Sequence, residues 1–267
     1  MNAQNSNIKI LISSHSKSSD IWYITDYFIK KHWKSKKEIL LGANGVDKKE
    51  FVPGDWKYIN QGDDISFSKS LKDYVNFVDS KYFILMLDDF IILEDVDINT
   101  VLKAFDFIEA RKGVYLRLIP SPKGDIRVDD DFSQIDVRAK VPYITSLHMS
   151  IWDRDFLLEL LKYDFNPWEF EIKAGKTKEA LKNYDKFFVT NYPFIKYTHF
   201  VEKGKFYPFI KDMLDKEGVK LNSDRKFWSK EELDRLNNDN IFKNFIRNVI
   251  PNRYINKIRS ILGRQEL

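Results

Sequence analysis

The fold is decided by the stretch Tyr82-Phe83-Ile84-Leu85-Met86-Leu87-Asp88-Asp89-Phe90, an apolar run that ends in two adjacent carboxylates. A strand that is buried on both faces of a sheet can be almost wholly apolar. Two carboxylates cannot stay buried without partners, because desolvating a charge costs more than the strand gains. We therefore expect Asp88 and Asp89 at the rim of a sheet, where a carboxylate pair can hold a divalent cation on a phosphate. An acidic turn after the strand is the alternative interpretation.

Strands and helices alternate in the rest of the amino-terminal half. Before the 82–87 strand we expect strands at 8–13, 39–42 and 56–60, and helices at about 20–33 and 66–78. This alternation is typical of an α/β protein with a Rossmann-like, mostly parallel mixed sheet flanked by helices. A helical extension is expected at the carboxyl terminus, so the predicted domains are 1–220 and 221–267.

Composition bounds the class of protein. The chain has 267 residues, of which 43% are hydrophobic and 31% charged, as in a soluble globular protein. It has no cysteine, which excludes disulfides, zinc–thiolate sites and cysteine nucleophiles and fits a reducing cytoplasm. We expect no signal peptide and no membrane span, because no apolar run is long enough.

Two common nucleotide-binding motifs are missing. The sequence holds only ten glycines and contains neither G-x-G-x-x-G after the first strand nor G-x-x-x-x-G-K-[ST]. A bound nucleotide would therefore have to be held by carboxylates, serines and aromatic side chains.

Positive charge is concentrated at the carboxyl terminus. Residues 241–267 carry six basic side chains and Glu266, a net charge of +5, so the remainder of the chain carries −1. The body therefore lacks the basic character of a nucleic-acid-binding protein, and no nucleic-acid partner is expected. Apolar residues at helical spacing in 241–250 and 254–262 alternate with these cations, which indicates a basic amphipathic pair of helices. Such a pair suits an anionic membrane surface, and packing onto the body is the alternative.

A second acidic segment, Asn166-Pro167-Trp168-Glu169-Phe170-Glu171, has an unusual composition. In an extended conformation Glu169 and Glu171 share one face, opposite Trp168 and Phe170. If the segment instead opens a helix with Pro167 at its first position, both carboxylates lie in the first turn, where the helix dipole favours them. The functional interpretation is a general base beside an aromatic platform.

The order of these segments resembles a known family. It comprises the first strand with its serine-rich loop and Asp20-Ile21-Trp22, Gly62-Asp63-Asp64 with Ser66-Phe67-Ser68, the 82–90 run, Ile151-Trp152-Asp153, and the 166–171 block. Together they are similar to bacterial GT-A-type glycosyltransferases of capsule and lipopolysaccharide gene clusters, over roughly residues 8 to 210. The 166–171 block is the most specific part of the resemblance.

The resemblance implies roles for individual residues. Asp88 and Asp89 would take the place of the metal-binding motif, which is usually Asp-x-Asp whereas the two acids are adjacent here, and would bind Mn²⁺ or Mg²⁺. His199 would complete the metal or diphosphate site, and Glu171, or failing that Glu169, would be the catalytic base. Donor-binding residues implied in this way are Ser13, Ser14, His15, Asp63, Asp64, Asp88, Asp89, Lys203 and Lys205.

Three further residues are candidates for binding the acceptor. Trp168 could pack on a sugar face, and Arg117 lies inside an apolar strand and needs a partner if it is buried. His148 alternates with Ser146 and Ser150 along a segment, 143–151, that we expect to be extended. The run 129–131 of three aspartates is most simply a solvated turn.

The leading hypothesis is a cytoplasmic glycosyltransferase, peripheral at the inner face of the membrane. It would move a sugar from a nucleotide-sugar to a lipopolysaccharide, O-antigen or capsule precursor, with inversion and a carboxylate base. One alternative is a magnesium-dependent nucleotidyl- or phosphosugar transferase that uses Asp88 and Asp89. The other is a non-catalytic, membrane-associated glycan-binding or assembly subunit.

Overall fold

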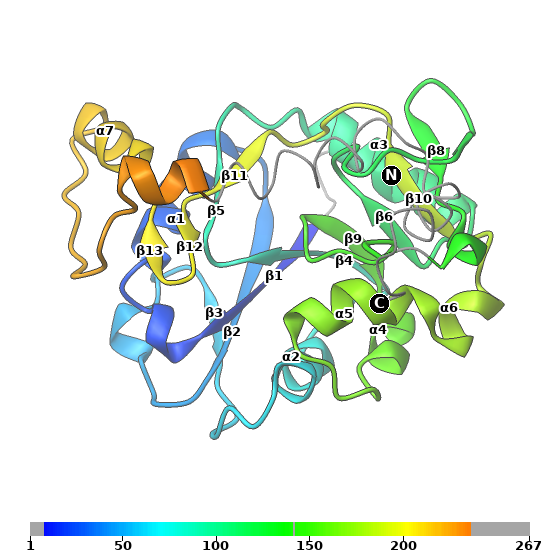
Figure 1. Ribbon diagram of the computed structural model, residues 1–267, viewed down its shortest axis with the longest axis horizontal. Coiled ribbons are helices and arrows are strands. Elements are labelled where there is room, and N and C mark those ends of the chain that lie inside the picture. Colours follow the sequence, from blue (N-terminus) through cyan, green and yellow to red (C-terminus); the bar gives the residue numbers. More distant parts are fainter. Residues whose placement is uncertain (1–7, 141, 236–267) are drawn as a thin grey trace.

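A nine-stranded mixed sheet forms the centre of the protein, in a computed structural model that describes residues 8–140 and 142–235. The strand order is β3-β2-β1-β4-β9-β6-β10-β8-β7 (Figure 1). Its strands are β1 Ile8–His15, β2 Lys37–Asn44, β3 Lys57–Ile59, β4 Tyr82–Leu87, β6 Tyr115–Arg117, β7 Ile126–Arg127, β8 Phe132–Gln134, β9 Ser150–Asp153 and β10 Phe187–Thr190. Two small antiparallel sheets pair β5 (Phe90–Ile92) with β11 (Tyr197–His199), and β12 (Val201–Glu202) with β13 (Lys205–Phe206).

The direction of the strands divides the large sheet into two regions. Strands β3, β2, β1 and β4 are all parallel, whereas β9 lies antiparallel between β4 and β6. Strand β10 is parallel to β6, and β8 and β7 then follow as an antiparallel hairpin. Only β9 and β8 oppose the common direction, so the predicted α/β class with a mostly parallel mixed sheet is confirmed.

Helices cover both faces of the sheet. They are α1 Trp22–His32, α2 Phe67–Asn76, α3 Ile98–Ala110, α4 Arg154–Leu160, α5 Pro167–Lys173, α6 Lys178–Lys182 and α7 Phe209–Lys216. Apolar residues of α1, α3 and α7 belong to one core cluster, and those of α2, α4, α5 and α6 to the other. The two groups occupy the upper and lower halves of Figure 1.

The apolar run of β4 follows from this two-sided cover. Ile84 and Met86 pack in the first cluster, and Phe83 and Leu85 in the second. Because successive side chains of a strand point to opposite faces, a strand between two helical layers is apolar at every position. The same alternation along β1 places Ile10 and Ile12 on one face and Leu11 on the other.

The 143–151 segment differs from the prediction. Only its last two residues belong to a strand, β9, and Tyr143 has a backbone φ of 65°. The expected alternation of Ser146, His148 and Ser150 along one extended face was therefore wrong. Ser150 Oγ instead bonds to the local backbone, donating to the His148 carbonyl at 2.8 Å.

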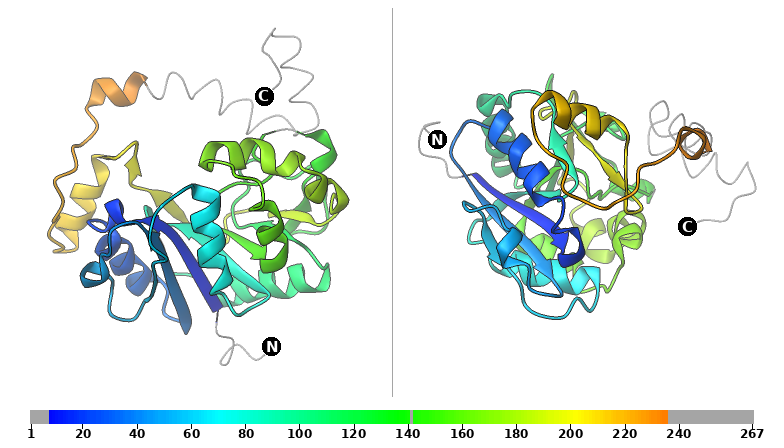
Figure 2. Two further views of the ribbon diagram at one scale, coloured as in Figure 1. Left: turned by 90° about the horizontal axis from the view of Figure 1, so that it is seen from below. Right: turned by 90° about the vertical axis from the view of Figure 1, so that its left-hand side faces the viewer.

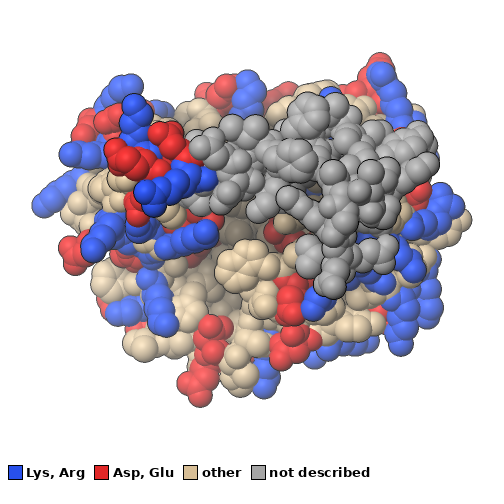
Figure 3. Space-filling view, in the orientation of Figure 1, with Lys and Arg blue, Asp and Glu red and all other residues tan. Residues whose placement is uncertain are grey.

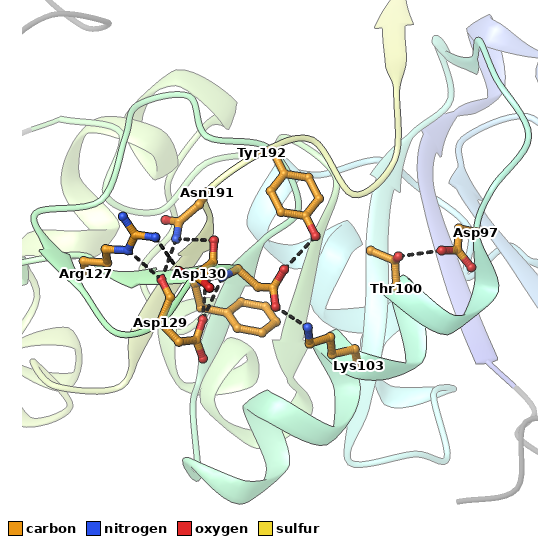
Figure 4. Close-up of polar contacts among 10 residues, drawn as sticks. Asp97, Thr100, Lys103, Arg127, Asp129, Asp130, Asn191 and Tyr192 are labelled. Atoms are coloured by element: carbon orange, nitrogen blue, oxygen red, sulfur yellow. Dashed lines mark hydrogen bonds and ion pairs between the residues drawn. The ribbon is translucent and has the colours of Figure 1, made fainter.

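The run of three aspartates at 129–131 is a turn, as predicted, between β7 and β8. Asp129 Oδ1 accepts the amides of Asp131 and Phe132, at 2.9 and 2.8 Å. Figure 4 shows Tyr192 and Lys103 on either side of the same carboxylate, which is that of Asp131.

Part of the predicted organisation lies outside the described residues. The basic amphipathic helices expected over 241–262 belong to it, and the domain boundary at residue 220 stays a prediction. Within 8–140 and 142–235, no helix has the length and hydropathy needed to cross a membrane.

Candidate functional site

A cavity of about 550 Å³ opens at the carboxyl ends of β1 and β4, between α2 and the start of α5. This is the edge where ligands bind in open α/β sheets. Six of the residues predicted for the site line it: Ser13, Ser14, His15, Asp64, Asp88 and Glu169. These six residues come from four separate segments of the chain.

Asp88 is held by hydroxyl groups at the end of β4. Ser14 Oγ donates to Asp88 Oδ2 at 2.5 Å, and Trp22 Nε1 donates to Ser14 Oγ at 2.8 Å. The Thr25 hydroxyl donates to the Asp88 carbonyl. Burial raises the pKa of the Asp88 carboxyl, and the hydroxyls of Ser14 and Ser18 oppose that rise.

Asp89 has a different environment from that of its neighbour. Its carbonyl accepts the Phe200 amide at 3.0 Å, but Oδ1 is buried and has no hydrogen-bond partner among the described residues. Burial, and then the charge of Asp88, raise the pKa of Asp89 well above its ordinary value. A buried carboxylate oxygen without a partner beside a second carboxylate is a place that a cation would stabilise.

His199 lies beside this pair without completing a metal site. It pairs with Phe90 across β11 and β5, and its Nε2 is 3.6 Å from Glu202 Oε2 and 3.4 Å from Tyr207 Oη. Burial lowers the pKa of His199. In the described part of the chain, no three His, Asp or Glu side chains are arranged to hold a metal ion. Two carboxylates remain, which is the number that commonly binds Mg²⁺ together with substrate phosphates.

His15 and Asp64 form the opposite wall of the cavity. The Lys17 amide donates to His15 Nδ1 at 2.9 Å, so the ring proton sits on Nε2, which lies 3.1 Å from Asp64 Oδ2. Ser70 Oγ donates to Asp64 Oδ1 at 2.6 Å. The other predicted carboxylate of this segment, Asp63, is exposed and is not part of the cavity lining.

Residues 167–171 belong to helix α5, so the helical interpretation of this sequence is confirmed, but only Glu169 lies in the first turn and the expectation that Glu171 does too was wrong. Asn166 and Glu169 form a capping box with Pro167 at the first turn. Glu169 Oε1 is 2.7 Å from Lys173 Nζ, and this contact, followed by the Asn166 amide, lowers the pKa of Glu169. Trp168 is 71% exposed, on the helix that borders the cavity.

Glu171 points to the loop that precedes β9. Its Oε1 accepts the Leu147 amide at 2.9 Å and the Ser146 hydroxyl at 3.2 Å. Its carbonyl accepts the Tyr143 amide at 2.8 Å. Glu171 is therefore a support for residues 143–147, of which Leu147 lines the cavity.

The other two acceptor candidates are bound to other parts of the protein. Arg117 is fully buried, and its Nη1 donates to the carbonyls of Ser121 and Tyr143, at 2.6 and 3.4 Å. His148 Nδ1 is 2.9 Å from Tyr197 Oη. Neither residue contributes to the cavity lining.

The two predicted diphosphate lysines belong to the β12–β13 hairpin. Lys203 is exposed in its turn, with φ of 49°. Lys205 Nζ is 2.5 Å from Glu232 Oε1 and 4.7 Å from the centre of the Trp228 ring. Neither lysine lines the cavity.

Sequence reasoning missed Arg225. Its guanidinium binds both carboxylate oxygens of Asp20 at 2.8 Å. Burial raises the pKa of Asp88 and of Asp89, and the charge of Arg225 opposes that rise. Arg225 lies in a polar connection without helical or strand periodicity. No local pattern distinguishes it from an ordinary surface arginine, and only the folded chain brings it to this edge of the sheet.

A second cavity, of about 690 Å³, lies at the β3 edge and includes Lys49, Trp56, Lys57, Tyr58 and Asn60. Several of its polar groups already have partners. Lys57 pairs with Glu38 at 2.6 Å, and Asn60 Nδ2 donates to Tyr58 Oη at 3.0 Å. None of the predicted site residues lines it, so the smaller cavity is the better candidate.

No family model matches the chain, and no curated protein matches its sequence. Solved structures similar to it include "Crystal structure of S. aureus TarS 1-349", at 12% identity and a TM-score of 0.44 over 69% of this chain and 57% of that one. The mannosyltransferase PcManGT from Pyrobaculum calidifontis, in complex with GDP-Man and Mn²⁺, has 11% identity and a TM-score of 0.48 over 75% of this chain and 59% of that one. UTP-bound UGPase from Acinetobacter baumannii has 7% identity and a TM-score of 0.47 over 73% and 88%.

These similarities are distant. The chain spans little more than half of the TarS fragment, 57% of its length. They place the chain in no family.

Proposed function

We propose that the protein is a glycosyltransferase that binds a nucleotide-sugar in the cavity at the ends of β1 and β4. The observation that carries this proposal is the meeting of Asp88, the His15–Asp64 pair and the start of α5 around one cavity. Hydroxyl and carboxylate groups of this kind can hold a ribose and a base by hydrogen bonds. The family resemblance of the motif blocks supports the same activity.

A divalent cation, Mn²⁺ or Mg²⁺, would be held by Asp88 and Asp89 on the donor diphosphate. The buried Asp89 Oδ1 without a partner fits such an ion. The bound ion would supply positive charge for the departing nucleoside diphosphate. Ser14 contributes by fixing the orientation of Asp88, and His15 and Asp64 contribute hydrogen-bonding groups on the other wall.

The transfer itself needs a base. The acceptor hydroxyl attacks the anomeric carbon, the bond from that carbon to the diphosphate oxygen breaks, and a carboxylate takes the hydroxyl proton. We place Glu169 first in this role and Glu171 second, which reverses the order expected from the sequence. Both carboxylates have partners, Glu169 in Lys173 and Glu171 in Ser146 and Leu147, but only Glu169 lines the cavity.

The acceptor is proposed to be a lipopolysaccharide, O-antigen or capsule precursor, and the stereochemistry inverting. Support comes from the family resemblance and from Trp168, whose exposed indole beside the cavity could pack on a sugar face. Cytoplasmic location at the inner face of the membrane, through residues 241–267, is part of the same proposal.

The test is a panel of nucleotide-sugars incubated with the full chain and Mn²⁺, Mg²⁺ or EDTA. Slow release of the nucleoside diphosphate, with a thermal shift for one donor, is the expected result. Pyrophosphate release from a nucleoside triphosphate and a sugar phosphate would instead identify a nucleotidyltransferase. A thermal shift without turnover, even with glycan acceptors present, would identify a non-catalytic binding subunit.

A further inference from the structure

The segment that follows α7 is tied to helix α1 and to the turn before it. Glu217 accepts hydrogen bonds from Tyr27, at 2.8 Å, and from Lys31. The Asn222 amide donates to Tyr23 Oη at 2.7 Å. Ser223 Oγ donates to Asp20 at 2.5 Å. We call residues 217–228 the strap.

The strap lies at one end of the molecule. Figures 1 and 2 show it, in orange, leaving α7 and running past α1 and the β12–β13 hairpin. Figure 3 shows Lys and Arg side chains among Asp and Glu side chains over this left-hand end. Its far end is joined to β13, because the Trp228 amide donates to the Phe206 carbonyl and the Phe206 amide to the Lys226 carbonyl, both at 2.9 Å.

The contact between Arg225 and Asp20 is a two-bond ion pair. Arg225 Nε and Nη2 each lie 2.8 Å from a different Asp20 oxygen, which is the two-bond geometry that makes arginine–carboxylate pairs strong. The side chains are only 17% and 30% exposed. Arg225 Nη2 also donates to the Lys17 carbonyl at 3.2 Å, so one guanidinium holds two points of the 16–20 turn.

This turn is a wall of the proposed donor cavity. It follows β1 directly, and its Ser18 lines the cavity together with Ser14 and His15. His15 is held against the same turn by the Lys17 amide. A turn anchored at Lys17 and Asp20 keeps these side chains in place before a ligand arrives, which reduces the ordering cost of binding.

We infer that Asp20 and Arg225 are positioning residues of the donor cavity: their ion pair locks the 16–20 turn, and so sets the affinity for a nucleoside diphosphate without contacting it. The inference rests on the proposed function. It also means that residues beyond 220 take part in forming the site, although they lie far from it in sequence.

The test compares variants of the full chain by titration calorimetry with UDP and GDP in the presence of Mn²⁺. Arg225→Ala and Asp20→Asn should each weaken binding about tenfold, an expected effect of lost preorganisation. Arg225→Lys keeps the charge but not the two-bond geometry, and should lie between wild type and Arg225→Ala. In donor hydrolysis, Arg225→Ala should raise KM more than it lowers kcat.

The matched control is Glu217→Gln, which weakens the strap at α1 but leaves the Asp20 contact intact. It should lower Tm and keep wild-type affinity. Equal affinity in wild type, Arg225→Ala and Arg225→Lys would overturn the inference and leave the proposed function standing. A wild type that binds no nucleoside diphosphate would overturn the proposed function and this inference with it.

Discussion

Two acidic clusters of similar sequence have opposite surroundings. Asp88 and Asp89 follow a parallel strand at the centre of the sheet, where one oxygen is buried without a partner among the described residues. The 129–131 turn joins two antiparallel strands at the sheet edge, where Arg127, Lys103 and Tyr192 pair with its carboxylates. The labelled side chains of Figure 4 show that network.

The difference comes from topology. Parallel neighbours end at the same edge of a sheet, so the polar residues that follow β1 and β4 converge. A hairpin turn has no such neighbours, and its carboxylates are satisfied within a few residues or by nearby surface cations. The same residue type is therefore paired with nearby cations in one region, whereas in the other it leaves a buried oxygen for the cation that we propose there.

The largest effect expected is on catalysis, from the carboxylates of α5. Glu169→Gln keeps the shape and the capping bonds, and should lower the transfer rate by about 10²–10⁴, because a general base is lost. Glu171→Gln should cost less, since it only weakens the support of residues 143–147. Steady-state kinetics with the identified donor measures the transfer rates of both variants. An unchanged rate for Glu169→Gln would mean that another residue is the base.

The next effect separates the two acidic clusters. Asp89→Asn should weaken metal-linked binding of the nucleoside diphosphate by about 100-fold, or about 2.7 kcal/mol. Asp130→Asn, in the exposed turn, is the control and should bind as wild type does. Calorimetry with Mn²⁺ and with EDTA measures both. If the two variants bind alike, the distinction between the clusters is wrong.

A third prediction concerns stability at the parallel side of the sheet. A Cβ atom at Gly42 in β2 would lie 2.1 Å from the Tyr74 ring, which lines the cavity. Gly42→Ala should therefore cost about 1–3 kcal/mol of unfolding free energy, as overpacking does, and disturb ligand binding. Gly54→Ala is the control, because no atom lies within 4 Å of its added Cβ. Urea denaturation measures the stability of both variants. Equal midpoints for Gly42→Ala and Gly54→Ala would contradict the overpacking argument.

The smallest expected effect is a pH-dependent change in stability, and it concerns Glu38 in β2. Hydrogen bonds from Lys57 and Lys9 lower the pKa of Glu38 to about 2, from an ordinary value of 4.5. Because the pKa of Glu38 is lower in the folded protein than in the unfolded chain, the ionised Glu38 side chain stabilises the fold. This stabilisation is complete above pH 4.5 and is lost as the pH falls from about 4.5 through about 2.

Glu38→Gln should therefore be less stable than wild type by about 1 kcal/mol at pH 7, with the difference vanishing toward pH 2. Glu50→Gln, at an exposed position, should show no such difference. Denaturation at several pH values measures it, and a gap that persists at low pH would mean that the ion pairs are not its source.

Local signals explain what the sequence could predict. Residues adjacent in the sequence were enough to predict three features: the apolar strand β4, the helix start at Asn166-Pro167, and the acidic residues that follow the strands. Residue type and position in the sequence were the only basis for assigning roles to His148, Arg117, Lys203 and Lys205. The partners that the structure shows lie far away in the sequence, as Tyr197 does for His148 and Glu232 for Lys205. Arg225 was not predicted at all, because only the folded strap brings it to Asp20 at the turn before α1.

The central claim is that the cavity at the ends of β1 and β4 binds the donor, and a crystal structure of the full chain with a nucleoside diphosphate and Mn²⁺ tests it most directly. The account predicts the ion between Asp88, Asp89 and the phosphates, with the nucleoside against His15 and Asp64. A ligand seated in the cavity beside Trp56 and Asn60, or an ion bound without Asp88 and Asp89, would contradict it.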